Sequence, residues 1–250
     1  MKNIYLIFVF LILLYGCKRE EPDSNIVVPP GITTLQPLKV IDLASILTEP
    51  SGIFYNSKNN SLLVVSDARP DIYELDLNGN LLNKISVAGV DMEGVTMTKN
   101  CDTIFVVEET ARLVSSFLYN GKKINSMLVD VATNPSHCLE GITFDDNYHL
   151  FVINERDPML MLEFVNGIEV SRKQLAHSTD VSDICYDKQT NCFWIISDES
   201  KKIFKLNRNG NLLGEWLVTF DKGEGITFVN DKMYIVRDTD AKMYIYNKPM

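Results

Sequence analysis

Acidic residues recur at two regular positions of the chain, where they could together bind a metal ion. Three glutamates stand before a glycine in similar short segments such as LEGITF; they are Glu93, Glu140 and Glu224. A second series follows apolar runs such as LLVV and IFVV, and comprises Asp67, Glu109, Glu155, Asp198 and Asp238. Carboxylates crowded together raise one another's pKa or require a cation. Several hard oxygen ligands favour Ca²⁺, whereas Zn²⁺ prefers nitrogen and sulfur.

These acids belong to an internal repeat, and the repeat predicts the fold. Five similar segments begin 42, 47, 42 and 42 residues apart, at residues 50–55, 92–97, 139–144, 181–186 and 223–228. Each is followed by a turn and an apolar run typical of a buried strand, and in the first four repeats by an Asn-Gly hairpin signal. Four strands in roughly 40–45 residues are typical of a propeller blade. We therefore predict an all-β, five-bladed β-propeller with four-stranded blades.

The fifth repeat stops one strand short, because the chain reaches Met250 where the fourth strand would begin. Residues 36–43 precede the first repeat and resemble fourth-strand segments such as LLNKISVA. We predict that this N-terminal strand closes the last blade, which gives one propeller domain over residues 35–250. A β-sandwich does not predict a fivefold repeat with a truncated last copy.

The first two strands of each blade should bring the acids to one mouth of the central channel. Neighbouring antiparallel strands place the start of one and the end of the other at the same rim. In the first and fourth repeats the glutamate position holds Ser51 and Ser182. We predict metal ligands at Glu93, Glu140, Glu224, Asp67, Asp198 and Asp238. Further ligands or rim residues are predicted at Glu109, Glu155 and Ser182.

Basic residues close to the second series of acids offer an alternative. Within a few residues of these acids lie Arg69, Arg112, Arg156, Arg237 and Lys201. They could neutralise the acids as ion pairs in a purely structural ring, or help the acids to orient a polar ligand without a metal. The sequence leaves these alternatives open.

His137, three residues before Glu140, is the one candidate for catalysis. A histidine beside a metal-bound water could act as a general base, although a loop histidine of this kind more often has no catalytic role. The chain contains neither a GxSxG motif nor a phosphate-binding glycine loop.

The composition is that of an ordinary acidic globular protein. Of the 250 residues 46% are hydrophobic, and 33 acids against 24 lysines and arginines give a net charge of −9. No cluster of basic residues provides a surface for nucleic acid, so nucleic-acid binding is excluded as a function. We expect a monomer.

The N-terminus predicts export and a lipid anchor. Residues 1–17 combine a basic start with a short apolar run that ends in Leu14-Tyr15-Gly16-Cys17. This resembles the signal peptide of a bacterial lipoprotein, in which Cys17 is acylated; a plain secretion signal is the alternative. Residues 18–34 are polar and proline-rich, which is typical of a tether. We expect a cell-envelope protein, an outer-membrane lipoprotein that faces the periplasm or the medium.

The four remaining cysteines would then face an oxidising compartment. They are Cys101, Cys138, Cys185 and Cys192. The last two flank a short turn and could form a disulfide across a hairpin. Free buried thiols are the equal alternative.

Two kinds of motif resemble the SdiA-regulated domain family. They are the EGIT segments and the stretches Ser66–Gly79 and Ser197–Gly210, which share an S-D-x₄-I-[YF]-x-L-x-x-N-G pattern. The resemblance covers residues 40–250 and implies a five-bladed envelope propeller with a calcium site, distantly similar to NHL repeats. The E-G motif also recurs in gluconolactonase- and regucalcin-like propellers, where that glutamate binds the metal. This carries the ligand role first to Glu93, Glu140 and Glu224, and then to Asp67, Asp198 and Asp238.

The resemblance implies a fold and a metal but no reaction. We therefore expect a membrane-anchored, calcium-binding propeller that recognises a small molecule or a protein, because loops on a rigid scaffold suit recognition. The alternative is a metal-dependent hydrolase of esters, lactones or phosphoesters that uses a calcium-activated water. A purely structural lipoprotein is the third possibility.

Overall fold

The computed structural model describes residues 31–131, 134 and 137–249. The predicted signal peptide, the lipidation site Cys17 and most of the predicted tether lie outside these ranges. The described residues form strands, turns and loops without a helix. Accordingly, no helix in this part of the chain is long and apolar enough to cross a membrane.

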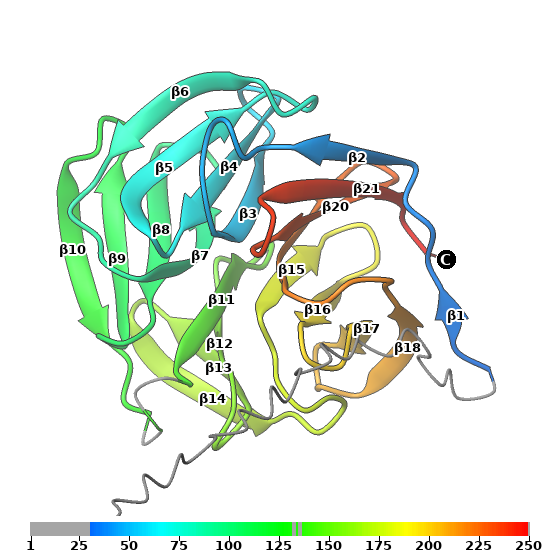
Figure 1. The fold of residues 1–250 in the computed structure, drawn as a ribbon. Coiled ribbons are helices and arrows are strands. Elements are labelled where there is room, and N and C mark those ends of the chain that lie inside the picture. Colours follow the sequence, from blue (N-terminus) through cyan, green and yellow to red (C-terminus); the bar gives the residue numbers. More distant parts are fainter. Residues whose placement is uncertain (1–30, 132–133, 135–136, 250) are drawn as a thin grey trace, which may run out of the picture. The chain divides into compact units, whose positions relative to one another are not determined.

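Five blades of four antiparallel strands surround a common centre, which confirms the predicted five-bladed propeller (Figure 1). Blade one contains β3 (Pro50–Asn56), β4 (Ser61–Ser66), β5 (Arg69–Leu75) and β6 (Leu81–Ser86). Blade two contains β7 (Met92–Met97), β8 (Thr103–Glu108), β9 (Leu113–Leu118) and β10 (Lys123–Leu128). Blade three contains β11 (Leu139–Phe144), β12 (Leu150–Asn154), β13 (Leu160–Val165) and β14 (Ile168–Gln174). Blade four contains β15 (Asp183–Asp187), β16 (Cys192–Ser197), β17 (Lys202–Asn207) and β18 (Leu212–Leu217).

The fifth blade combines strands from both ends of the described chain. Its order is β19 (Gly223–Val229), β20 (Lys232–Arg237), β21 (Lys242–Asn247) and β2 (Lys39–Asp42). Strand β2 pairs antiparallel with β21 and places Lys39 opposite Ile245. Just before it, β1 (Thr33–Thr34) pairs in parallel with β18 of blade four. The last residues of the predicted tether are therefore part of a sheet.

The hydrophobic core is divided into five clusters, and each cluster lies between two neighbouring blades. The second strand of a blade contributes to two clusters at once, because its side chains alternate between its two faces. In β4, for example, Leu62 packs toward blade five and Leu63 toward blade two, and both are fully buried. Each such side chain contributes about 1.5–3 kcal/mol by leaving water. The continuous apolar runs of the sequence thus hold neighbouring blades together.

Near their start, the innermost strands approach one another so closely that four of them have a glycine at the contact, where a side chain would have almost no room. A Cβ atom on Gly52 would lie 2.4 Å from the carbonyl oxygen of Glu93, and one on Gly94 would lie 2.5 Å from that of Glu140. Blade four has Asp183 at this position. Its buried carboxylate accepts a hydrogen bond from the backbone N–H of Ile226 at 2.9 Å. Inter-blade backbone contact therefore fixes the start of each innermost strand.

Cys101, Cys185 and Cys192 are free thiols, and Cys101 and Cys192 are buried. In the β15–β16 ladder Cys185 lies opposite Trp194, whereas Cys192 lies opposite Asp187. The hairpin register therefore offsets the two thiols that the sequence allowed to pair.

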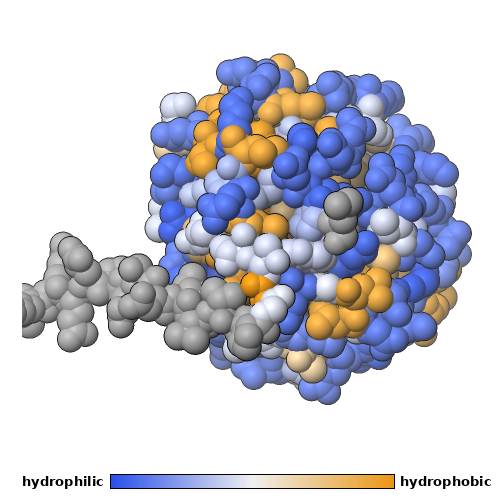
Figure 2. Space-filling model, turned by 90° about the vertical axis from the view of Figure 1, so that its right-hand side faces the viewer, coloured by the Kyte–Doolittle hydropathy of each residue, from blue (hydrophilic) through white to orange (hydrophobic). Residues whose placement is uncertain are grey.

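The molecular surface is mostly hydrophilic, with apolar side chains in separate groups on the face that Figure 2 shows. The outermost strands leave several large apolar side chains exposed, among them Leu82 and Ile168 at 57% and 68%. Scattered apolar residues of this kind are normal on a soluble protein.

Candidate functional site

An acidic cavity of about 250 Å³ lies where the innermost strands begin and the second strands end. Its carboxylates are Glu49, Asp67, Glu93, Glu109, Glu140, Glu155, Asp180, Asp198, Glu224 and Asp238. The remaining lining residues are Ser51, Ser182, Arg156 and Lys222. Every residue that the sequence predicts as a metal ligand or rim position is in this lining. The cavity is thus the predicted acidic mouth, built by all five blades.

A β-bulge aims the inner ring of side chains into the cavity. In blade two Met92 pairs with Glu108 and Gly94 pairs with Val107, so Glu93 between them has no partner on the neighbouring strand. Ser51, Glu140 and Glu224 stand at the same register shift in blades one, three and five. A bulge re-aims the side chain of its extra residue and is common beside functional sites. The E-G motif therefore combines a bulged glutamate with the glycine of the closest inter-blade contact.

Two overlapping groups of carboxylates could each hold a cation. Oxygen atoms of Glu109, Glu140 and Glu155 all lie within 4.8 Å of one another. The same holds for Asp91, Glu93 and Glu109. Glu109, which the sequence places as a further rim residue, is therefore common to both groups.

Burial and mutual repulsion raise the pKa values of several acids in the cavity. For Glu93 and Glu140 burial is the main cause and neighbouring carboxylates add to it, so that both pKa values lie well above the ordinary range. Burial also raises the pKa of Glu224 to about 8, that of Glu155 to about 7 and that of Asp67 to about 6. The cavity therefore takes up protons readily when no other cation is present.

Few cations compensate this charge. Lys222 contacts Asp198 at 2.7 Å and Glu224 at 3.7 Å, and Arg156 contacts Glu155 at 3.3 Å. Within the described residues, Glu93 and Glu140 make neither an ion pair nor a hydrogen bond through their side chains.

The basic residues expected to neutralise the outer ring mostly bind elsewhere. Arg237 contacts Asp221 and Asp240, and Lys201 also contacts Asp221. Arg112 donates to the backbone carbonyl of Val131 at 2.8 Å. Of the five predicted cations, Arg156 alone forms an ion pair with its strand-end acid among the described residues. In the described residues, these side chains therefore do not neutralise the whole ring of acids.

Sequence reasoning missed a third regular position, two residues before the inner ring. It holds Glu49, Asp91, Asp180 and Lys222 in four of the blades. Three of them, Glu49, Asp91 and Lys222, have left-handed backbone with φ between 50° and 57°, a conformation that non-glycine residues rarely adopt outside functional or tightly constrained sites. The repeated spacing was visible in the sequence, but the residue types vary too much to stand out.

His137 lies beside the cavity without being part of its lining. One ring nitrogen is 3.3 Å from the carboxylate of Asp157, and the other is 2.9 Å from the guanidinium of Arg156. Arg156, which lines the cavity, therefore connects His137 to it.

The donor atoms in the lining fit a hard cation. They are carboxylate and hydroxyl oxygens, with no histidine or cysteine among the lining residues. Ca²⁺ takes six to eight oxygen ligands in flexible geometry, whereas a zinc site normally includes nitrogen or sulfur. The residues present therefore suit calcium.

Comparison with known proteins gives a family and a fold. The family model described as SdiA-regulated matches residues 34–179 and 166–248. A PQQ-bound aldose sugar dehydrogenase from Streptomyces coelicolor is similar in structure, with a TM-score of 0.60 and 11% identity over 88% of this chain and 99% of that chain. A catalytically inactive virginiamycin B lyase from Staphylococcus aureus with quinupristin has a TM-score of 0.50 and 15% identity over 85% of this chain and 74% of that one. At these identities the structural likeness shows the fold alone.

Proposed function

Since the chain belongs to the SdiA-regulated family, we propose that it is a calcium-binding propeller that serves as a recognition module in the bacterial cell envelope. One observation carries the proposal: partly buried carboxylates from five blades converge on a single cavity, with two cations to balance them. Keeping carboxylates charged out of water is costly unless a cation pairs with them. A divalent ion would balance several of them at once.

The two groups of carboxylates that share Glu109 would provide the calcium ligands. Glu140 and Glu155 complete one group, and Asp91 and Glu93 complete the other. The predicted ligands Asp67, Asp198 and Glu224 line the same cavity, and we propose them as additional ligands or as residues that orient bound water. Calcium bound there would join blades two and three and stiffen the loops of that face.

Recognition is favoured over catalysis because the lining offers ligands for a cation but no histidine or nucleophilic thiol. Rigid blades that present loops around a charged cavity suit the binding of a polar small molecule or a protein loop.

A metal-dependent hydrolase is the second candidate, and one observation favours it. The pKa of Glu155 is raised to about 7 and that of Glu224 to about 8, because both are buried among other acids. A carboxylate with a pKa near neutrality can accept a proton from an attacking water. Hydrolysis of an ester or lactone panel, lost in Glu224→Gln while calcium binding persists, would establish this activity.

The envelope location rests on the N-terminal sequence. We propose that Cys17 is acylated and anchors the propeller to a membrane through residues 18–34. Replacing Cys17 with Ser should move the protein from the membrane fraction to the soluble fraction. Equal membrane retention of both forms would contradict the anchor.

Calcium titration with thermal unfolding tests the proposed site. A ligand at 100 times its Kd stabilises a protein by about 2.7 kcal/mol, which corresponds to roughly 5–10 °C in Tm for a domain of this size. We expect that shift with Ca²⁺, and its loss in Glu140→Gln. Glu169→Gln, on outer strand β14, is the matched control and should keep the full shift. A Tm unaffected by millimolar calcium would contradict the proposal.

A further inference from the structure

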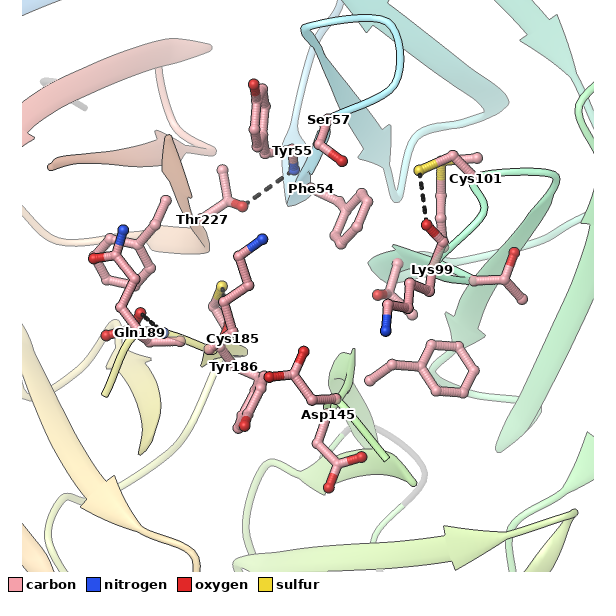
Figure 3. A pocket seen from close by; sticks show the side chains of 18 of the residues that line it. Phe54, Tyr55, Ser57, Lys99, Cys101, Asp145, Cys185, Tyr186, Gln189 and Thr227 are labelled. Carbon is pink, nitrogen blue, oxygen red and sulfur yellow. Dashed lines mark hydrogen bonds between the residues drawn. The ribbon is translucent and has the colours of Figure 1, made fainter. Parts of the chain in front are cut away.

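A second pocket of about 280 Å³ lies where the innermost strands end. All five blades line it, as Figure 3 shows for Tyr55, Lys99, Asp145, Cys185 and Thr227. We call it the distal pocket, because the same strands begin at the acidic cavity and end here. Four residues of strand separate the two along β11, which corresponds to roughly 13 Å. The glycine layer of closest strand approach stands between them.

The walls of the distal pocket are aromatic and held in place from behind. They include Phe54, Phe144, Tyr186 and Phe228. Phe144 meets Phe105 edge to face with ring centroids 5.1 Å apart, Tyr186 packs on Phe193 at 5.5 Å, and Phe228 packs on Trp194 at 5.2 Å. A pocket whose walls are already packed needs little reorganisation to accept a flat apolar ligand.

One buried hydroxyl in this pocket lacks a partner that its equivalents have. Thr227 accepts a hydrogen bond from the backbone N–H of Tyr55, and Thr143 accepts one from that of Tyr186, both at 3.1 Å. Thr96 occupies the same repeat position in blade two. It is fully buried, and its hydroxyl has no partner in the described structure. A buried hydroxyl left unsatisfied is costly, so a ligand atom that reached it would gain a hydrogen bond.

The charges around the distal pocket favour an anion. Lys99 and Lys188 line it, and neither forms an ion pair within the described residues. The aspartates are mostly engaged: Asp145 pairs with Arg208, and Asp187 pairs with Lys248 at 2.5 Å. Asp146 is the one exposed acid left among the lining residues that the structure describes. With Asp145 and Asp187 paired, the lining leaves two lysines against one exposed acid, in a chain whose net charge is −9.

We propose that the distal pocket binds a small anionic ligand with a flat apolar body, of the aromatic carboxylate class. The ring would lie against the aromatic walls, and Lys99 and Lys188 would hold the carboxylate. The Thr96 hydroxyl would hydrogen-bond a polar substituent on the ring. The cavity volume of about 280 Å³ lies just below the usual range for small-molecule sites, roughly 300–1,000 Å³, which suits one or two fused rings.

A pair of probes with the same ring and opposite charge tests the proposal. Binding of 2-naphthoate and of 2-naphthylmethylamine is measured by isothermal titration calorimetry on the full propeller. We expect the carboxylate to bind at least 10-fold more tightly than the amine. Combined replacement of Lys99 and Lys188 with Gln should weaken the carboxylate at least 10-fold, whereas Lys122→Gln, an exposed lysine near outer strand β10, should leave it unchanged.

Thr96→Val gives an independent readout. Removing an unsatisfied buried hydroxyl should raise Tm, weaken binding of 6-hydroxy-2-naphthoate by 3- to 10-fold and leave binding of 2-naphthoate unaffected. Glu140→Gln should not change binding of either probe, which separates this site from the calcium site. Equal affinity for the amine, or full affinity in the double lysine variant with an unchanged Tm, would overturn the proposal.

Discussion

At the scale of single residues, the main feature of the protein is a set of buried carboxylates that repel one another in the acidic cavity. Glu93 and Glu140 stand on bulges that point them at other carboxylates, and burial raises both of their pKa values well above the ordinary range. Such an arrangement opposes folding unless protons or a metal ion neutralise it. Two predictions follow from that conflict.

The first concerns pH. Asp67, Glu155 and Glu224 have pKa values of about 6, 7 and 8 in the folded protein, against roughly 4 for an ordinary carboxyl group. Between about pH 5 and 8 the folded protein therefore holds protons that the unfolded chain has released, so the free energy of unfolding decreases as pH rises. Without calcium, we expect Tm to fall across this window. With saturating calcium the bound ion replaces the protons, and Tm should hold or rise.

Melting curves at several pH values, with EGTA or with Ca²⁺, check this prediction. A calcium-free Tm that rises steadily from pH 5 to 8 would contradict it. Asp231→Asn, a change at an exposed acid outside the cavity, should leave the pH dependence unaltered.

The second prediction concerns the sign of one mutation. Glu140→Gln removes a charge repelled by its neighbours, so without calcium at pH 8 it should stabilise the fold by about 1–3 kcal/mol. With calcium it should destabilise the protein relative to wild type, because a ligand is lost. Urea unfolding in the two conditions measures both effects, and the same sign in both would count against a metal role for Glu140.

At the scale of elements, the innermost strands carry most of what could be read from the sequence. The E-G motif predicts a channel-facing acid, and the structure places Glu93 in the cavity lining. The structure adds that Gly94, the next residue, stands where the neighbouring strand leaves no room for a side chain. The outer-ring cations could not be predicted in the same way. Arg237 lies within a few residues of the strand-end acid Asp238, but its guanidinium pairs with Asp221 and Asp240. Ion-pair partners depend on loop paths that the repeat does not encode.

The crowding at this layer gives a direct test. In Gly94→Ala the new Cβ would meet the carbonyl oxygen of Glu140 at 2.5 Å and the Cα atom of Gly141 at 3.0 Å, both of them backbone atoms. We expect a loss of about 2–4 kcal/mol in the free energy of unfolding. In Gly89→Ala the new atom meets the flexible side chain of Met92, so the loss should be smaller. Equal stability of the two variants in chemical denaturation would contradict the close-approach interpretation.

At the scale of the whole molecule, the repeat predicted the architecture, whereas the N-terminal segment added a strand pairing that no sequence pattern predicted. The five repeated segments sufficed to predict the number of blades. The pairing of β1 with β18 could not be foreseen, because two residues of a proline-rich segment carry no strand signal. Likewise, the ligand site in the distal pocket could not be predicted. The sequence does not show which of the equivalent threonines, Thr96, Thr143 or Thr227, lacks a hydrogen-bond partner, because that is decided by three-dimensional contacts.

Truncation tests the contribution of the N-terminal segment. A chain that begins at residue 43 loses β1 and β2 and leaves the edge of β21 unpaired, so we expect Tm to fall by at least 10 °C or the protein to aggregate. A chain that begins at residue 31 keeps both strands and should melt like the mature protein. Equal melting temperatures of the two chains would contradict this role.

The central claim is that the acidic cavity is a calcium site, and anomalous diffraction from crystals grown with calcium tests it most directly. We predict an anomalous peak bounded by the carboxylates of Glu109, Glu140 and Glu155, and its disappearance in Glu140→Gln crystals grown in the same way. Water alone between those three carboxylates, in crystals that diffract well enough to distinguish the two, would contradict the claim.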